Sequence, residues 1–231
     1  MLGDAADVGK VASNVASGVK IPSVPREDEP WTWLRRDEVS SLFAQVLTPA
    51  QRAIFTVAIY TGLRPGEIFG LRWQDVTDTE IVVRRSYNGP TKKGRVRRVP
   101  ILAPVREALK VWRHEKPGVA GALVFPGQPT WRYPDFHGCH SKGYDAGFAD
   151  VIAKVVTDRP VRFYDLRHTA ASHLIQGTLV EGLPPLRLED VQLWLGHASR
   201  TTTERYAHLA PDRLHGLVRG MGLDVRKKKD G

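Results

Sequence analysis

The chain is poor in cysteine and contains no long apolar run. Cys139 is the single cysteine among its 231 residues, which excludes an internal disulfide framework and indicates a reducing compartment. No apolar run reaches the roughly 18 residues of a membrane span, and no secretory signal is present. We therefore expect a cytoplasmic protein that makes no use of a membrane.

Metal ligands are also scarce. His137 and His140 lie close to Cys139, but no second pair of ligands stands at a spacing suited to zinc. No cluster of carboxylates is suited to a pair of catalytic metal ions. The sequence therefore predicts neither a metal site nor a cofactor.

Positive charge is what the chain has in excess. It carries 34 Lys and Arg against 25 Asp and Glu, a formal net charge of +9, and its isoelectric point is about 9.8. Such a surplus is typical of proteins with polyanionic partners, although it also suits a membrane surface or serves solubility alone.

The pattern along the chain predicts three parts. Residues 1–30 combine a weak apolar stripe with a proline-rich, charged run that is typical of a linker. Residues 31–215 have the apolar periodicity of a folded domain, and residues 216–231 form a basic tail.

The central part is predicted to be mostly helical. Residues 80–101 form the exception, because apolar and basic positions alternate there on both sides of a turn, as in a β-hairpin. Residues 123–126 are expected to form a short strand. The predicted class is α+β, with a small antiparallel sheet at one edge of a helical domain. Helices are expected at 35–46, 49–60, 104–116, 141–157, 165–176 and 188–195.

Two arginines lie where helices are expected to begin. Arg64 directly precedes Pro65, and Arg167 falls in the first turn of the helix 165–176. A positive charge at a helix N-terminus opposes the helix dipole, so each arginine needs an anionic partner. Glu67 could be the partner of Arg64, and for this motif alone an internal salt bridge and ligand binding are equally good interpretations.

The tip of the predicted hairpin is densely cationic. Charged edge hairpins commonly prevent aggregation, but five cations within seven positions favour a loop that contacts phosphates. These cations are Lys92, Lys93, Arg95, Arg97 and Arg98.

The last motif of the domain is W-L-G-H-A-S-R-T-T-T-E-R-Y at 194–206. Gly196 can end a helix, and the pair Thr201 and Glu204 predicts a capping box that opens a new helix carrying Tyr206. His197 precedes Tyr206 by nine residues, which indicates a phenol held beside an anion. On this motif alone, a helix-end histidine and a packing tyrosine are the simpler interpretation.

Five motifs together resemble the catalytic domain of the phage-type tyrosine recombinases, the integrases. They occur in the family's order and spacing, and the resemblance covers residues 31–215. It implies the DNA breaking-rejoining fold of that family. The motifs are T-G-L-R-P-G-E-I (61–68), T-K-K-G-R-V-R-R-V-P (91–100), Y-D-L-R-H-T (164–169), L-G-H (195–197) and T-T-T-E-R-Y (201–206).

The resemblance also implies roles for individual residues. Lys92, eight residues before Pro100, corresponds to the family's hairpin lysine. The other expected catalytic residues are the arginines Arg64 and Arg167, the third-motif histidine His197 and the nucleophile Tyr206. Lys93, Arg95 and Arg97 are expected to bind DNA, and Glu67, Tyr164 and His168 to support the site.

Tyr164 departs from the family pattern. The family usually has a histidine three residues before the second arginine, and that histidine is given the role of general base. Phenols ionise only near pH ~10, so a tyrosine is a poor proton acceptor at neutral pH. We expect Tyr164 to hydrogen-bond a phosphate oxygen or to hold Arg167, and His168 to be a buried structural hydrogen bonder.

The activity implied by the resemblance is site-specific recombination of DNA, as in integration or excision of a phage or mobile element. Strands would be cut and rejoined without metal through a covalent 3′-phosphotyrosine. The implied partners are double-stranded attachment sites, three further copies of the chain in a homotetramer, and accessory directionality or bending proteins. The setting would be the nucleoid of a bacterial or phage-infected cell.

Only about 30 residues precede the matching region, where family members normally carry a helical core-binding domain. We therefore expect a fragment or a truncated member, with residues 1–30 as a remnant of that domain. Two other functions fit the same residues: relaxation of DNA by a type IB topoisomerase, and DNA binding without catalysis.

Overall fold

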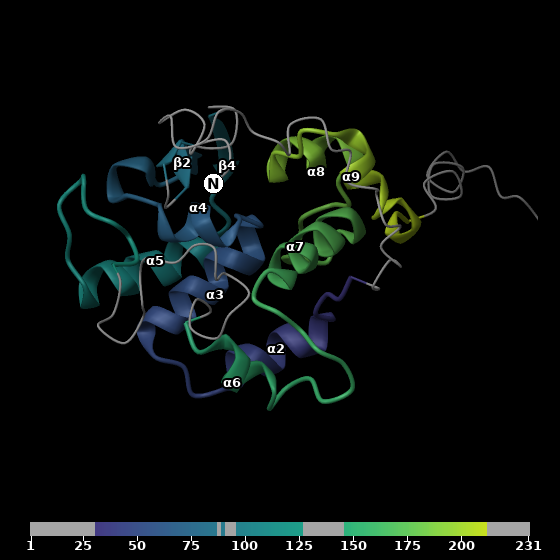
Figure 1. The fold of residues 1–231 in the computed structure, drawn as a ribbon, viewed down its shortest axis with the longest axis horizontal. Helices are drawn as coiled ribbons and strands as arrows, with labels where there is room; N and C mark the ends of the chain where they lie inside the picture. The colour runs from purple at the N-terminus through teal and green to yellow at the C-terminus, as the bar shows by residue number, and fades with distance from the viewer. Residues whose placement is uncertain (1–30, 87–88, 91–95, 127–145, 212–231) are drawn as a thin grey trace, which may run out of the picture. The chain divides into compact units, whose positions relative to one another are not determined.

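The computed structural model describes residues 31–86, 89–90, 96–126 and 146–211 (Figure 1). The chain divides into two compact units, Met1–Trp31 and Thr32–Gly231. The fold described below is that of the second unit.

The predicted class, α+β with a small antiparallel sheet, is confirmed. The helices are α2 (Arg36–Ala44), α3 (Pro49–Thr61), α4 (Pro65–Phe69), α5 (Ala103–Glu115), α6 (Phe148–Ile152), α7 (Asp165–Gln176), α8 (Leu188–Leu195) and α9 (Arg200–Glu204). Two 3₁₀ helices are η1 (Trp73–Asp75) and η3 (Ala207–Leu209). The strands are β1 (Glu80–Val83), β2 (Arg85–Ser86), β3 (Gly89–Pro90) and β4 (Arg97–Pro100).

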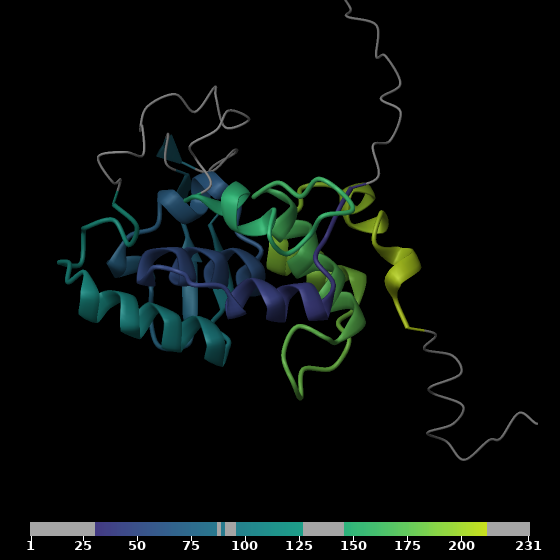
Figure 2. The same cartoon turned by 90° about the horizontal axis from the view of Figure 1, so that it is seen from below.

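Helix α3 is the central element of the core. It begins at a reciprocal cap, in which Thr48 Oγ1 accepts from the Gln51 amide at 3.2 Å and Gln51 Oε1 accepts from the Thr48 amide at 3.0 Å. Its side chains are apolar nearly all round, and it packs against α5 and α7 (Figures 1 and 2). A helix that is apolar on every side must be covered on every side, which explains its central place.

The predicted hairpin is present as the antiparallel pair β1–β4. Glu80 lies opposite Pro100, and Val83 lies opposite Arg97. A second, shorter pair, β2–β3, continues toward the tip. The tip residues Lys92, Lys93 and Arg95 lie outside the described residues.

Two predicted elements differ from the observed ones. The described part of the expected helix 141–157 is helical only over Phe148–Ile152, because Gly147 adopts a left-handed φ of 77° directly before it. The expected strand 123–126 is reduced to a single bridge between Arg72 and Leu123. Pro126, the last residue of the expected strand, cannot donate to a ladder.

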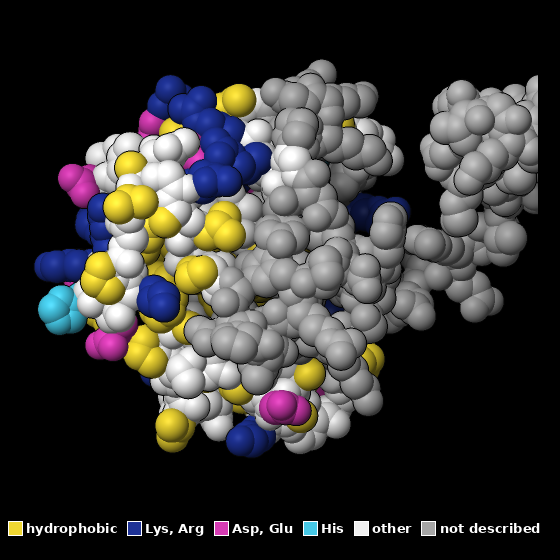
Figure 3. Space-filling view, turned by 60° about the vertical axis from the view of Figure 1, so that its left-hand side comes forward, with side chains coloured by type: hydrophobic (Ala, Val, Ile, Leu, Met, Phe, Trp, Pro, Cys, Tyr) yellow, Lys and Arg dark blue, Asp and Glu magenta, His cyan; other side chains and the backbone are white. Residues whose placement is uncertain are grey.

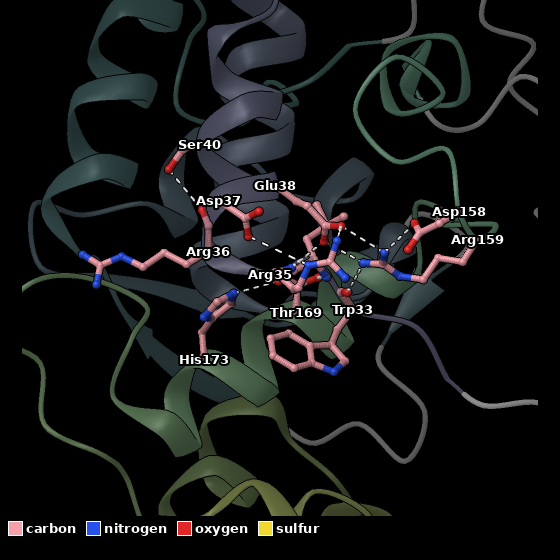
Figure 4. A network of polar contacts seen from close by, with 11 residues as sticks. Trp33, Arg35, Arg36, Asp37, Glu38, Ser40, Asp158, Arg159, Thr169 and His173 are labelled. Carbon is pink, nitrogen blue, oxygen red and sulfur yellow. Dashed lines mark hydrogen bonds and ion pairs between the residues drawn. The ribbon is translucent and has the colours of Figure 1, made fainter.

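The stretch that leads into α2 is tied to α7, the helix that carries Arg167 (Figure 4). The Leu34 amide donates to Thr169 Oγ1 at 3.0 Å, and the Leu34 oxygen is 2.8 Å from His173 Nε2. Arg159 binds both carboxylate oxygens of the buried Glu38, at 2.9 and 2.6 Å. These contacts fix the start of the domain onto α7 and onto the segment that precedes α7.

Candidate active site

Arg64 is held at the start of α4 by Glu67. One Glu67 oxygen accepts from the Arg64 amide at 2.8 Å, and the other accepts from Arg64 Nη1 at 3.1 Å. The Arg64 side chain remains 40% exposed. The structure thus contains the internal salt bridge considered for this motif, and it leaves part of the Arg64 guanidinium at the surface.

Glu67 is buried and serves two arginines. Arg97 Nη1 and Nη2 donate to its two oxygens at 2.8 and 2.6 Å, which is a bidentate pair. Burial alone would raise the pKa of the Glu67 carboxyl, but the hydrogen bonds and charges of Arg97 and Arg64 outweigh it and lower the pKa to about 2. Glu67 is therefore an anion at neutral pH.

Arg97 joins three elements of the domain. Besides its pair with Glu67 on α4, its Nε donates to the Trp194 oxygen at the end of α8, at 3.3 Å. A Cβ built on Gly196 would lie 2.7 Å from Arg97 Cδ, so only a residue without a side chain fits beside Arg97 at this position. The Arg97 side chain is 14% exposed, and its contact with DNA stays a prediction.

Arg167 finds its partners at the C-terminal ends of two other helices. Its Nη1 donates to the Gly62 oxygen after α3 at 2.6 Å, and its Nη2 donates to the Leu195 oxygen of α8 at 2.8 Å. Carbonyl groups at a helix C-terminus lack intrahelical partners and carry partial negative charge. These two carbonyls offset the unfavourable position of Arg167 in the first turn of α7.

Arg167 is 2% exposed, and it stays charged. Burial, together with the nearby charge of Arg64, lowers the pKa of Arg167 to about 10. The guanidinium is therefore protonated at neutral pH.

His197 follows directly after Gly196, whose φ of 69° ends α8 in the predicted left-handed conformation. Its Nδ1 lies 2.8 Å from Thr203 Oγ1. Burial, followed by the charges of Arg167 and Arg64, lowers the pKa of His197 to about 3. The imidazole is therefore neutral at neutral pH. If the Thr203 hydroxyl donates to Nδ1, the ring hydrogen is on Nε2.

Thr203 was not among the predicted site residues. It is fully buried on α9, whereas Thr201 and Thr202 are exposed. Within the run T-T-T, the motif gives no sign of which hydroxyl turns inward. The six-residue separation between Thr203 and His197 becomes informative only once the turn between α8 and α9 is known.

Tyr206 lies in a turn between α9 and η3, and the expectation that it lies on a helix opened by Thr201 was wrong. Helix α9 begins at Arg200, has no side-chain cap, and ends at Glu204. Its run of β-branched threonines has weak helix propensity, which suits a helix this short. Tyr206 is 3% exposed, and burial raises the pKa of its hydroxyl.

The Tyr206 hydroxyl is 2.5 Å from Nδ1 of His168. His168 was expected to be a structural hydrogen bonder, and its observed partner is the predicted nucleophile. Burial lowers the pKa of His168. Tyr164, by contrast, is 44% exposed, and its ring stands edge-on to the His168 ring with centroids 5.6 Å apart.

Four of the five predicted catalytic residues converge on one region. The charges of Arg64 and Arg167 both act on His197, and the charge of Arg167 also acts on Tyr206. Helix α8, which ends just before His197, touches α7, which carries Arg167, and α9, which precedes Tyr206. The fifth residue, Lys92, lies outside the described residues.

Within the described ranges, no group of three His, Cys, Asp or Glu side chains is placed to hold a metal ion. The trio His137, Cys139 and His140 falls outside those ranges.

No helix among the described residues is both long and apolar enough to cross a bilayer. Figure 3 shows Lys and Arg side chains gathered toward the top of one face.

Fold and site together define a class: a helical domain in which two arginines act on a neutral histidine, and one of these arginines also acts on a buried tyrosine. The family model described as Phage integrase family matches residues 32–213. The chain belongs to this family, so the resemblance drawn from the five motifs is confirmed.

Individual relatives are tyrosine recombinases. Tyrosine recombinase XerC of Xanthomonas campestris pv. campestris (strain B100) is 28% identical over 227 residues, which cover 96% of this chain and 64% of the relative. The chain therefore spans somewhat under two thirds of that relative's length.

Solved structures share the fold. The XerA recombinase aligns with a TM-score of 0.59 at 24% identity, over 87% of this chain and 66% of the other. XerH site-specific recombinase, solved bound to a palindromic difH substrate in a post-cleavage complex, aligns with a TM-score of 0.58 at 22% identity, over 81% of this chain and 52% of the other.

Proposed function

We propose that this chain is the catalytic part of a site-specific recombinase that cuts and rejoins double-stranded DNA through a covalent 3′-phosphotyrosine at Tyr206. The observation that carries the proposal is that the charge of the buried Arg167 acts on both His197 and Tyr206, while the charge of Arg64 also acts on His197. The net charge of +9 and the DNA-bound XerH relative of the same fold support DNA as the partner.

The proposed chemistry follows from the groups present. Cleavage of a phosphodiester concentrates negative charge on the two non-bridging oxygens while the nucleophile enters. Arg64 and Arg167 remain charged across the physiological pH range and have planar donors that match these oxygens. The guanidinium N–H groups that do not bind Glu67 or the helix-end carbonyls are the ones we propose to meet the phosphate.

His197 and Lys92 complete the proposed site. His197 is neutral, and with Thr203 donating to Nδ1 its Nε2–H would donate to a phosphate oxygen. The Tyr206 oxygen bonds to phosphorus, the bond to the 5′ oxygen breaks, and Lys92 protonates the departing 5′ oxygen. The phosphotyrosine conserves the energy of the broken bond, so that another strand can be joined to it without ATP.

The wider setting belongs to the same proposal. The substrates would be attachment sites of a phage or mobile element, acted on in the cytoplasm at the nucleoid. The active form would be a homotetramer on two duplexes, assisted by directionality or bending proteins. The segments 1–30 and 216–231 would serve as the remnant of a core-binding domain and as a basic tail.

Covalent trapping tests the proposal. A pool of nicked suicide duplexes, in which the cleaved strand diffuses away, should yield a protein–DNA adduct that survives denaturing electrophoresis. Tyr206→Phe should abolish the adduct and leave DNA binding within a few fold. An adduct that persists in Tyr206→Phe would remove Tyr206 from the mechanism. Binding without any adduct in the wild type would favour a non-catalytic module, and plasmid relaxation without a specific site would favour a topoisomerase.

A further inference from the structure

The proposed reaction leaves one step without an assigned group. Before or as the Tyr206 oxygen bonds to phosphorus, its hydroxyl must lose a proton. Burial raises the pKa of this hydroxyl, which makes a nearby proton acceptor more necessary. The acceptor must lie within hydrogen-bond distance of the Tyr206 oxygen.

Most polar groups around Tyr206 are unsuited to this task. The arginines are protonated and only donate. His197 has its Nδ1 engaged with Thr203 at 2.8 Å, and its strongly lowered pKa makes it a weak base. Asp165 is bound by the Arg162 amide at 2.8 Å and by the Arg162 side chain. Tyr164 is itself a phenol, and a phenol hydroxyl is a poor proton acceptor.

His168 has the required geometry and charge state. Its Nδ1 is 2.5 Å from the Tyr206 oxygen. Since burial keeps the imidazole neutral at neutral pH, Nδ1 can accept a proton when the ring hydrogen is on Nε2. Several charged groups act on the His168 ring. Asp165 favours its protonation, whereas three arginines oppose it: Arg162, Arg167 and Arg205. The other titratable groups next to it are Tyr164, Tyr206 and His197.

We propose that His168 is the general base for Tyr206, in the role that the family gives to the position occupied here by Tyr164. His168 Nδ1 takes the phenol proton as the Tyr206 oxygen bonds to phosphorus and the bond to the 5′ oxygen breaks. The departing 5′ oxygen receives its proton from Lys92. In rejoining, a 5′ hydroxyl gives its proton to the neutral Lys92 amine and attacks phosphorus. The bond between phosphorus and the Tyr206 oxygen breaks, and that oxygen takes its proton back from His168. This inference rests on the proposed function.

The first test separates proton transfer from simple positioning. In His168→Asn, the side-chain amide of the asparagine can hydrogen-bond the Tyr206 hydroxyl but cannot accept its proton at neutral pH. Positioned acid–base groups contribute about 10²–10⁴-fold to rates, so His168→Asn should slow single-turnover formation of the adduct by roughly a hundredfold or more, with unchanged DNA binding and thermal unfolding. A near-normal rate in His168→Asn would reduce His168 to a positioning residue and overturn the proposal.

Tyr164→Phe is the matched control. It removes a hydroxyl from the ring that neighbours His168, and Tyr164 is largely exposed, so the fold should tolerate the change. We expect Tyr164→Phe to slow adduct formation far less than His168→Asn does, because the Tyr164 hydroxyl is expected to bind a phosphate oxygen or to hold Arg167 and not to take the proton. A loss as large as that of His168→Asn would assign the proton acceptor to Tyr164 instead.

A second test remains informative even if His168→Asn is poorly folded, because it compares two nucleophiles within the same variant. Tyr206 is replaced by a fluorinated tyrosine whose phenol ionises near neutral pH and needs little help from a base. The defect of His168→Asn should then shrink at least tenfold. A 5′-thio leaving group should give His168→Asn no such rescue, since it acts on the other proton. A defect that the thio substrate rescues, or that the fluorinated tyrosine leaves intact, contradicts the assignment.

Failure of the proposed function has a separate signature. It appears as an adduct that persists in Tyr206→Phe, whatever happens at His168. The present proposal fails when adduct formation requires Tyr206 but is insensitive to His168→Asn.

Discussion

Removing the Arg97 guanidinium tests whether this residue is a structural link or a DNA contact. In Arg97→Ala, the buried Glu67 loses its bidentate partner and keeps only the half-exposed Arg64. The lowering of the Glu67 pKa from 4.5 to about 2 corresponds to about 3 kcal/mol at 1.36 kcal/mol per unit. Breaking one side of a buried ion pair typically costs about 3–5 kcal/mol. We therefore expect Arg97→Ala to lower the free energy of unfolding by about 3 kcal/mol.

Arg98→Ala is the matched control, since Arg98 is the next residue on β4 and is an arginine too. It pairs with Glu80, but its side chain is 66% exposed, and exposed pairs contribute at most about 1 kcal/mol. Urea unfolding at pH 7 should separate the two variants clearly. An Arg97→Ala protein as stable as Arg98→Ala would refute the link between β4, α4 and α8.

The pH dependence of stability checks the same reasoning. Because the folded-state pKa of Glu67 is lowered, its contribution is fully present above the unfolded value of 4.5 and is lost as pH falls toward about 2. In Arg97→Ala this acid-dependent loss should be smaller, since less of the pKa shift remains. If Arg97 instead binds DNA, Arg97→Ala should weaken binding and flatten its salt dependence without affecting stability.

Two further predictions concern the proton donors of the site. Lys92→Ala should slow cleavage, because the departing 5′ oxygen loses its proton donor. A substrate with a 5′-thio leaving group should restore the rate, since a thiolate leaves without a proton. If this substrate rescues Lys93→Ala instead, the proton donor is Lys93. Thr203→Val keeps the volume on α9 but removes the hydroxyl at Nδ1 of His197, so the ring hydrogen is no longer confined to Nε2. Single-turnover cleavage should fall by about tenfold with little change in DNA binding, and an unchanged rate would show that the His197 tautomer does not depend on Thr203.

Local signals explain what the sequence could predict. The ends of α3 follow from a capping threonine at one end and from Gly62 at the other, whose φ is 64°. Arg64 could be placed at a helix start because Pro65 follows it. All of these signals act over a few residues, so they survive without knowledge of the tertiary structure.

The partners of the site residues could not be predicted in the same way. Arg167 donates to the oxygen of Gly62, which is 105 residues away, and His168 meets Tyr206 across 38 residues. One available signal was overlooked. Strand β4 alternates, so Arg97 shares a face with the buried Val99, whereas Arg98 points the other way. Period two alone indicates that the Arg97 side chain lies on the same side of the strand as the buried Val99.

The position of Arg167 depends on how closely α3 and α8 approach each other. Trp194 Nε1 donates to the Thr61 oxygen at 3.0 Å, and a Cβ on Gly62 would lie only 2.4 Å from Leu195 Cδ2. This approach brings the Gly62 and Leu195 oxygens to the same guanidinium, at 2.6 and 2.8 Å. The charge that would meet a phosphate is thus oriented by backbone, which has no rotamers to adjust. A glycine that permits close packing therefore contributes to the site without touching any substrate.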